Sequence, residues 1–336
     1  MNCKMAEKVA NAILYEGYML YPYRHSALKN RQRWTFGILY PPAYEEVSRG
    51  TERSAMHTEC LVQAQPDACV RIELRFLHLI ARQVAERKAD GEMKRAPALV
   101  IDGQLMETCD GALQRSQEFH SFVGAPVQTL PFTFTGSRIT EPLWDNSGER
   151  VGERSVTQEE IRGTVTVATE VIAHGLWKLT IDVANTSAQA AGPRDRDVAL
   201  MSSLLSAHTI LTVTGGNFIS LLDPPQEFQQ FTSSCRNLGN FPVLVGAEGE
   251  RDMLLCSPIL LYDYVQIAPE SVGDFYDATE MDEMLTLRVM TLTDAEKAEV
   301  RLGDERARSL LERTEQSARE QLSRTHGTIR SMRPVE

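Results

Sequence analysis

The clearest pattern along the chain is a regular alternation of apolar and polar residues between positions 163 and 183. One alternating run covers residues 163–172, a second covers residues 176–183, and residues 173–175 separate them. A period of two is typical of strands, and a short gap that contains glycine is typical of a tight turn. We therefore predict a β-hairpin whose packed side chains are Val165, Val167, Leu179 and Ile181.

Alternation elsewhere predicts further strands and turns. Residues 70–76 alternate, and together with residues 57–64 they suit a second hairpin that turns at residues 65–68. Residues 208–214 form another β-rich run, after which Gly215 and Gly216 favour a turn between strands. These glycines lack the other residues of a phosphate-binding or dinucleotide-binding loop, so neither nucleotide motif is present.

The helical signals lie mainly at the two ends of the chain. Residues 5–14 match a short helix with Val9 and Ile13 on one face. Residues 84–96 are charged and poor in apolar side chains, which is typical of a solvated loop or an exposed helix. Thr293 and Glu296 form a capping-box pattern. Apolar spacings of three and four then predict a helix over residues 305–325, with its packed side formed by Leu311, Ala318 and Leu322.

Together these elements predict an α+β fold that is rich in antiparallel, β-sandwich-like sheets and has a C-terminal helical segment. We expect an N-terminal β-rich α+β region over residues 1–145 and a β-sandwich-like region over residues 155–292. Helices are expected over residues 293–327. All three regions are compatible with one compact unit.

The composition is that of a globular protein with a negative charge. The 336 residues are 42% hydrophobic and 24% charged, and the formal net charge is -11. That charge argues against non-specific nucleic-acid binding, because a polyanion would be repelled. No run is apolar enough for a membrane span, and the N-terminus lacks the apolar core of a signal peptide. We therefore expect a cytoplasmic protein.

The cysteines are scattered and show no metal-binding or disulfide pattern. We expect all six to be reduced in the cell. Cys235 is the best candidate for a reactive thiol, because Arg236 beside it would lower a thiol pKa; an inert buried thiol is the alternative. The seven histidines never fall within four residues of one another, so no local metal pair is visible, and His78 between leucines suits the edge of a core.

The segment of residues 15–34 combines aromatic and basic residues in a way that suits recognition. Four tyrosines and a tryptophan alternate with basic side chains, and no acid occurs between Glu16 and Glu45. Such residues bury a large area and also form oriented, charge-assisted hydrogen bonds. The alternative is a tyrosine-rich strand or turn whose arginines pair with acids elsewhere in the fold. The candidate binding residues are Tyr21, Tyr23, Arg24, Lys29, Arg31, Arg33 and Trp34.

Residues 263–283 contain seven acids and no Lys, Arg or His. Clustered carboxylates bind hard cations such as Ca²⁺ or Mg²⁺, although the spacing matches no EF-hand loop. A solvated acidic segment is one alternative, and pairing with the basic cluster of residues 24–33, within the chain or across a dimer, is another. The candidate metal ligands are Asp274, Asp277 and Glu280. No motif implies a cofactor, and no catalytic residue can be assigned.

Several sequence segments resemble those of a known family. Two of them begin at Tyr15 and Lys29, and three more begin at Ser257, Ile267 and Thr279. With them, the chain from about residue 8 to about residue 315 resembles an uncharacterised bacterial family encoded beside high-affinity nickel–iron uptake hydrogenases. The resemblance implies a role in assembly, maturation or support of the hydrogenase. It supplies no catalytic motif, and the absence of a Cys/His cluster argues against direct handling of nickel or iron–sulfur groups.

These observations favour a cytoplasmic accessory or assembly protein that binds a protein partner, with a hydrogenase subunit as the partner that the resemblance suggests. One alternative is a metal-dependent hydrolase that uses the carboxylates of residues 263–283 to hold an ion. Another is a structural homo-oligomer whose basic and acidic segments pair across an interface.

Overall fold

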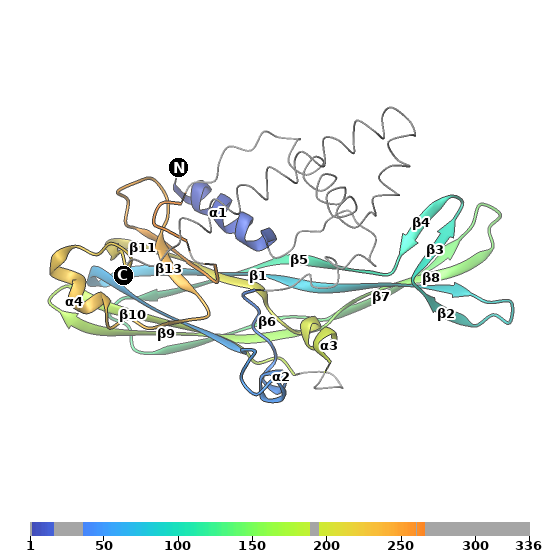
Figure 1. Ribbon diagram of the computed structural model, residues 1–336, viewed down its shortest axis with the longest axis horizontal. Coiled ribbons are helices and arrows are strands. Elements are labelled where there is room, and N and C mark those ends of the chain that lie inside the picture. The colour runs from blue at the N-terminus through green and yellow to red at the C-terminus, as the bar shows by residue number, and fades with distance from the viewer. Residues whose placement is uncertain (1, 17–35, 189–194, 260, 266–336) are drawn as a thin grey trace, which may run out of the picture. The chain divides into compact units, whose positions relative to one another are not determined.

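The computed structural model describes residues 2–16, 36–188, 195–259 and 261–265, and antiparallel strands dominate them (Figure 1). The prediction of a β-rich α+β fold is therefore confirmed. The chain divides into two compact units, residues 1–267 and 268–336, and every described residue belongs to the first. The predicted helices of residues 293–327 lie outside the described residues.

The described part contains four α-helices and a 3-10 turn: α1 (Asn2–Glu16), α2 (Pro42–Val47), α3 (Arg196–Met201), η2 (Gln226–Phe228) and α4 (Gln229–Thr232). The strands before residue 145 are β1 (Ala55–Arg87), β2 (Met93–Ala96), β3 (Ala98–Ile101), β4 (Gln104–Glu107), β5 (Cys109–Phe122), β6 (Gln128–Phe134) and β7 (Ser137–Trp144). The strands after it are β8 (Arg150–Gln158), β9 (Ile161–Ala173), β10 (Leu176–Asn185), β11 (Leu205–Ile219), β12 (Asn237–Leu238), β13 (Phe241–Leu244) and β14 (Met253–Ser257).

Strand β1 organises the large sheet because it changes partners along its length. On one edge it pairs in turn with β10, β5 and β2. On the other edge it pairs with β11 over residues 61–77 and then with β8 over residues 81–86. All of these pairings are antiparallel. A strand of 33 residues thereby links the two halves of the sheet.

The predicted hairpin at residues 65–68 is wrong, because the chain continues in the same direction through that segment. Ala64 of β1 pairs with Gly216 of β11, and the next paired residue of β1, Cys69, pairs with Thr214. Residues 65–68 of β1 therefore lie opposite the single residue Gly215. This is an enlarged bulge. Pro66 supplies the proline signal that resembles a turn, but here it sits where β1 changes its partner from β10 to β5.

Two further sequence predictions are corrected by long strands. Gly215 and Gly216 do not form a turn, because β11 runs straight through them, and the positive φ of Gly215 (86°) falls opposite the bulge. Residues 84–96 form neither an isolated loop nor a helix. They are the end of β1, a turn and β2, and their charged side chains are mostly exposed on this hairpin.

The predicted hairpin over residues 163–183 is confirmed. Strands β9 and β10 pair up to Ala173 opposite Leu176, which leaves His174 and Gly175 as a two-residue turn. Gly175 has a φ of 71°, a conformation that glycine adopts without steric cost. All four predicted core side chains are buried: Val165, Val167, Leu179 and Ile181.

The main core lies between the apolar face of β1, β5 and β11 and the apolar face of β6, β9 and β10. Phe132 of β6 contacts Phe76 of β1 and Phe119 of β5, with ring centroids 6.4 and 6.3 Å apart. Sheet faces that share one core in this way form a sandwich-like packing. The aromatic contacts and the aliphatic side chains around them bury the large apolar area that stabilises the fold.

Helix α1 covers the opposite face of the sheet, over β11 and β14. Its residues Val9 and Ala10 pack in one buried cluster with Ile210 and Leu255. The helix predicted over residues 5–14 is confirmed, with Val9 on its packed face, whereas the side chain of Ile13 is outside the described part of the structure. Within the described residues, no helix has both the length and the apolar character needed to cross a membrane.

Candidate functional site

Most of the predicted site residues cannot be placed. The aromatic-basic residues and the candidate metal ligands lie outside the described residues: Tyr21, Tyr23, Arg24, Lys29, Arg31, Arg33, Trp34, Asp274, Asp277 and Glu280. Asp263, the first acid of the acidic segment, is described. Its two carboxylate oxygens accept hydrogen bonds from Ser220 Oγ and from the backbone N–H of Leu244 (2.7 Å). Asp263 therefore ties the end of β11 to β13.

Of the two interpretations of Cys235, the structure favours an inert thiol over a reactive one. Burial, followed by the negative charge of Glu59, raises the pKa of Cys235 to about 11, and Lys178 offsets this only in part. Arg236 contributes its backbone N–H, which donates to Glu59 Oε2 at 2.7 Å. A thiol with so high a pKa is a poor nucleophile at neutral pH. The five cysteines with described side chains all carry free thiols.

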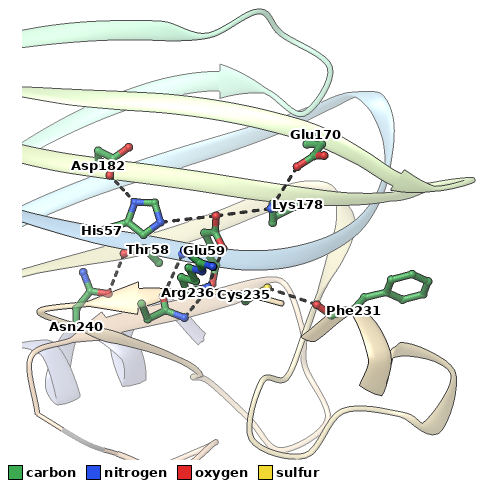
Figure 2. Close-up of polar contacts among 11 residues, drawn as sticks. His57, Thr58, Glu59, Glu170, Lys178, Asp182, Phe231, Cys235, Arg236 and Asn240 are labelled. Carbon is green, nitrogen blue, oxygen red and sulfur yellow. Dashed lines mark hydrogen bonds and ion pairs between the residues drawn. The ribbon is translucent and has the colours of Figure 1, made fainter. Parts of the chain in front are cut away.

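Glu59 is the centre of the polar cluster around Cys235 (Figure 2). Its side chain is only 12% exposed, and Lys178 Nζ lies 3.6 Å from its Oε1. Lys178 also pairs with Glu170 on β9 at 3.2 Å. The backbone of Glu59 exchanges two hydrogen bonds with the side chain of Asn237, at 3.0 and 3.2 Å. These contacts fasten the segment that leads into β12 to the sheet.

His57 joins the same cluster from β1. Its Nδ1 lies 2.6 Å from Oδ1 of Asp182, its cross-strand partner on β10, and its Nε2 lies 3.7 Å from Glu59 Oε1. Figure 2 shows the imidazole between these two carboxylates. No group of three or more His, Cys, Asp or Glu side chains in the described residues could hold a metal ion. These contacts join β1 to β9, β10 and the segment that leads into β12.

A different region presents side chains to solvent in an unusual way. The β3–β4 hairpin carries Val100 and Leu105 directly opposite each other, and they are 64% and 59% exposed. The alternate positions of β3 face inward, where Ile101 is buried and Leu99 lies close to Gly152 of β8. An apolar cross-strand pair therefore occupies the outer face of this hairpin.

Strands β7 and β8 extend the end of β1 into a four-stranded region in the order β7, β8, β1, β2, which we call the tip sheet. The β3–β4 hairpin lies at the same end of the sheet in Figure 1. The backbone N–H of Asn146 donates to Asp102 Oδ2 at 2.9 Å, which joins the β7–β8 turn to the β3–β4 turn. The tip sheet and the hairpin are thus held together.

Two apolar side chains of β7 add to the exposed pair on the hairpin. Ile139 and Trp144 are each 56% exposed. Single exposed apolar residues are common, whereas neighbouring ones such as Val100 and Leu105 are typical of an interaction surface. We call these four side chains the tip surface: Val100, Leu105, Ile139 and Trp144.

The tip surface was not among the features predicted from the sequence, although one signal was available. Asp102 and Gly103 stand between two short apolar runs, and this dipeptide is a strong hairpin signal. In the structure both residues have a positive φ, 48° and 80°, as such a turn requires. The hairpin was therefore predictable, whereas the exposure of Val100 depends on how the hairpin packs.

Comparison with known proteins adds no relatives: no protein-family model matches the chain, and no curated protein matches it.

Proposed function

We propose that this chain is a cytoplasmic accessory or assembly protein that binds a protein partner through the tip surface. The observation that carries the proposal is the outward-facing pair of Val100 and Leu105 on a hairpin whose other face is packed. The free thiols of the described cysteines suit a reducing compartment.

The energetics of the pair favour a binding role. An aliphatic side chain of this size gains about 1.5–3 kcal/mol when it is fully buried. Val100 and Leu105 gain less than half of this on folding, because more than half of each residue stays exposed. Burial against a partner would supply the remainder.

The resemblance to a family encoded beside nickel–iron uptake hydrogenases makes a hydrogenase subunit the first partner to test. In this proposal the chain supports assembly of the enzyme without handling metal itself. The aromatic-basic residues 21–34 are proposed as a second contact with the same partner, because arginine and tyrosine are enriched in the central residues of interfaces.

The test compares two matched double variants in which exposed apolar residues become serine. Val100→Ser with Leu105→Ser removes the pair on the hairpin. Val171→Ser with Leu238→Ser removes slightly less exposed residues elsewhere on the sheet (58% and 52%). Tagged chains are purified from the native host, and the purified hydrogenase subunits are then added to each chain.

We expect the first double variant to lose the partner and the second to retain it, with melting temperatures within a few degrees of the parent chain. Retention of the partner by both variants would show that the tip surface is not the binding site. The same samples separate the homo-oligomer alternative, because that alternative predicts a change of mass in light scattering when the pair is removed and no second protein in the complex.

A further inference from the structure

Among the described residues, the outer edge of β7 is open to a backbone partner. In the described part of the chain β7 pairs with β8 alone, so the backbone groups along its other edge pair with no described strand. Every side chain from Ser137 to Pro142 is exposed, on both faces of the strand. Proteins commonly block such edges with proline or a bulge. In β7, Pro142 and the irregular register between Leu143 and Trp144 block only the end of the strand.

We propose that residues 137–141 of β7 accept an extended segment of the protein partner as a fifth strand of the tip sheet. The inference rests on the proposed function, because this edge lies on the strand that carries Ile139 and Trp144 of the tip surface. In strand addition, main-chain hydrogen bonds provide the affinity and alternate side chains provide the specificity. The open edge supplies the first of these requirements.

Arg138 and Ile139 define the chemistry of the added strand. Arg138 is exposed and has no carboxylate partner among the described residues, whereas Glu141 is paired with Arg154 at 2.7 Å. Ile139 points to the other face, where its cross-strand partner is Val156. Neighbouring residues of a strand alternate between faces. The added segment therefore places an acidic residue beside Arg138 and the adjacent apolar residue beside Ile139.

The experiment uses the full-length chain and two blocked synthetic peptides, Ser-Val-Glu-Val-Ser-Val and its analogue with lysine in place of glutamate. Binding is followed by amide hydrogen exchange of residues 137–141 at several peptide concentrations and at low salt. Opposite charges across a strand pair favour binding, so we expect the glutamate peptide to bind about two- to fivefold more tightly. Arg138→Glu is expected to reverse this preference.

A third peptide, the glutamate sequence with alternate amides N-methylated, tests the backbone contribution, and we expect it not to bind. Equal binding of the methylated peptide, an unchanged charge preference in Arg138→Glu, or no slowed exchange at residues 137–141 would each overturn strand addition. The proposed function is judged separately by the Val100 and Leu105 variant. If that variant loses its partner while the edge binds no peptide, partner binding stands and strand addition fails.

Discussion

At the scale of single residues, Glu59 shows how one buried carboxylate sets the properties of its neighbours. It raises the pKa of Cys235, contacts Lys178 and accepts the backbone N–H of Arg236. A buried acceptor that serves several donors costs about 1–3 kcal/mol to remove, because its partners lose their hydrogen bonds and cannot all reach water.

We therefore expect Glu59→Gln to change thiol chemistry and Glu59→Ala to change stability. Glutamine keeps an acceptor for the Arg236 N–H but removes the negative charge, so the pKa of Cys235 should fall while burial still holds it above its ordinary range. Alkylation of Cys235 at pH 9, followed by peptide mass spectrometry, should become faster, with Cys69 as an internal reference. An unchanged rate would mean that burial alone controls this thiol. Glu59→Ala should lower the free energy of unfolding by about 1–3 kcal/mol.

At the scale of elements, the contact between the β3–β4 hairpin and the tip sheet depends on Gly152. A Cβ atom at this position would lie 2.4 Å from the carbonyl oxygen of Ala85 and 2.7 Å from Leu99 Cδ2. The backbone oxygen cannot rotate away as a side chain does, so any larger residue displaces either β8 or the hairpin.

Gly152→Ala is expected to loosen the hairpin while leaving the central sheet intact. Overpacking of this kind costs about 1–3 kcal/mol. Amide hydrogen exchange should become faster across residues 98–107 and stay unchanged across residues 163–183. Ser155→Ala on the same strand is the control. Unchanged exchange in the hairpin would show that its position does not depend on this contact.

The elements also show which parts of the fold the sequence could predict. The β9–β10 hairpin was predictable because its alternation and its turn lie within about twenty neighbouring residues. The continuity of β1 was not, because residues 65–68 carry a local turn signal, and only pairing with the distant strands β11 and β5 shows that the chain continues. The tip surface also depends on contacts between segments that are distant in the sequence. Its hairpin has a local signal, but the exposure of Val100 is decided by packing against β8.

At the scale of the whole molecule, two buried histidines link stability to pH. Neither His78 nor His208 has measurable exposure. His208 Nδ1 hydrogen-bonds the carbonyl of Ser206 at 2.9 Å, and His78 Nε2 hydrogen-bonds that of Glu159 at 2.9 Å. Burial lowers the pKa of each histidine from 6.5 to about 4, and Arg75 beside His208 and Arg115 beside His78 act in the same direction.

The consequence is a loss of stability in mild acid. With a folded pKa below the unfolded value, each histidine binds protons first in the unfolded chain, so its contribution is complete above pH 6.5 and declines toward pH 4. By pH 5 the free energy of unfolding should have fallen by about 2 kcal/mol for each histidine. Arg71 lowers the pKa of Glu118, but the resulting loss of stability begins only below pH 4.5. The loss between pH 7 and pH 5 is therefore assigned to the histidines. Urea unfolding at pH 7.5 and pH 5 measures the difference, which His208→Gln should roughly halve. Equal pH dependence in the parent chain and in His208→Gln would show that His208 titrates alike in the folded and unfolded states.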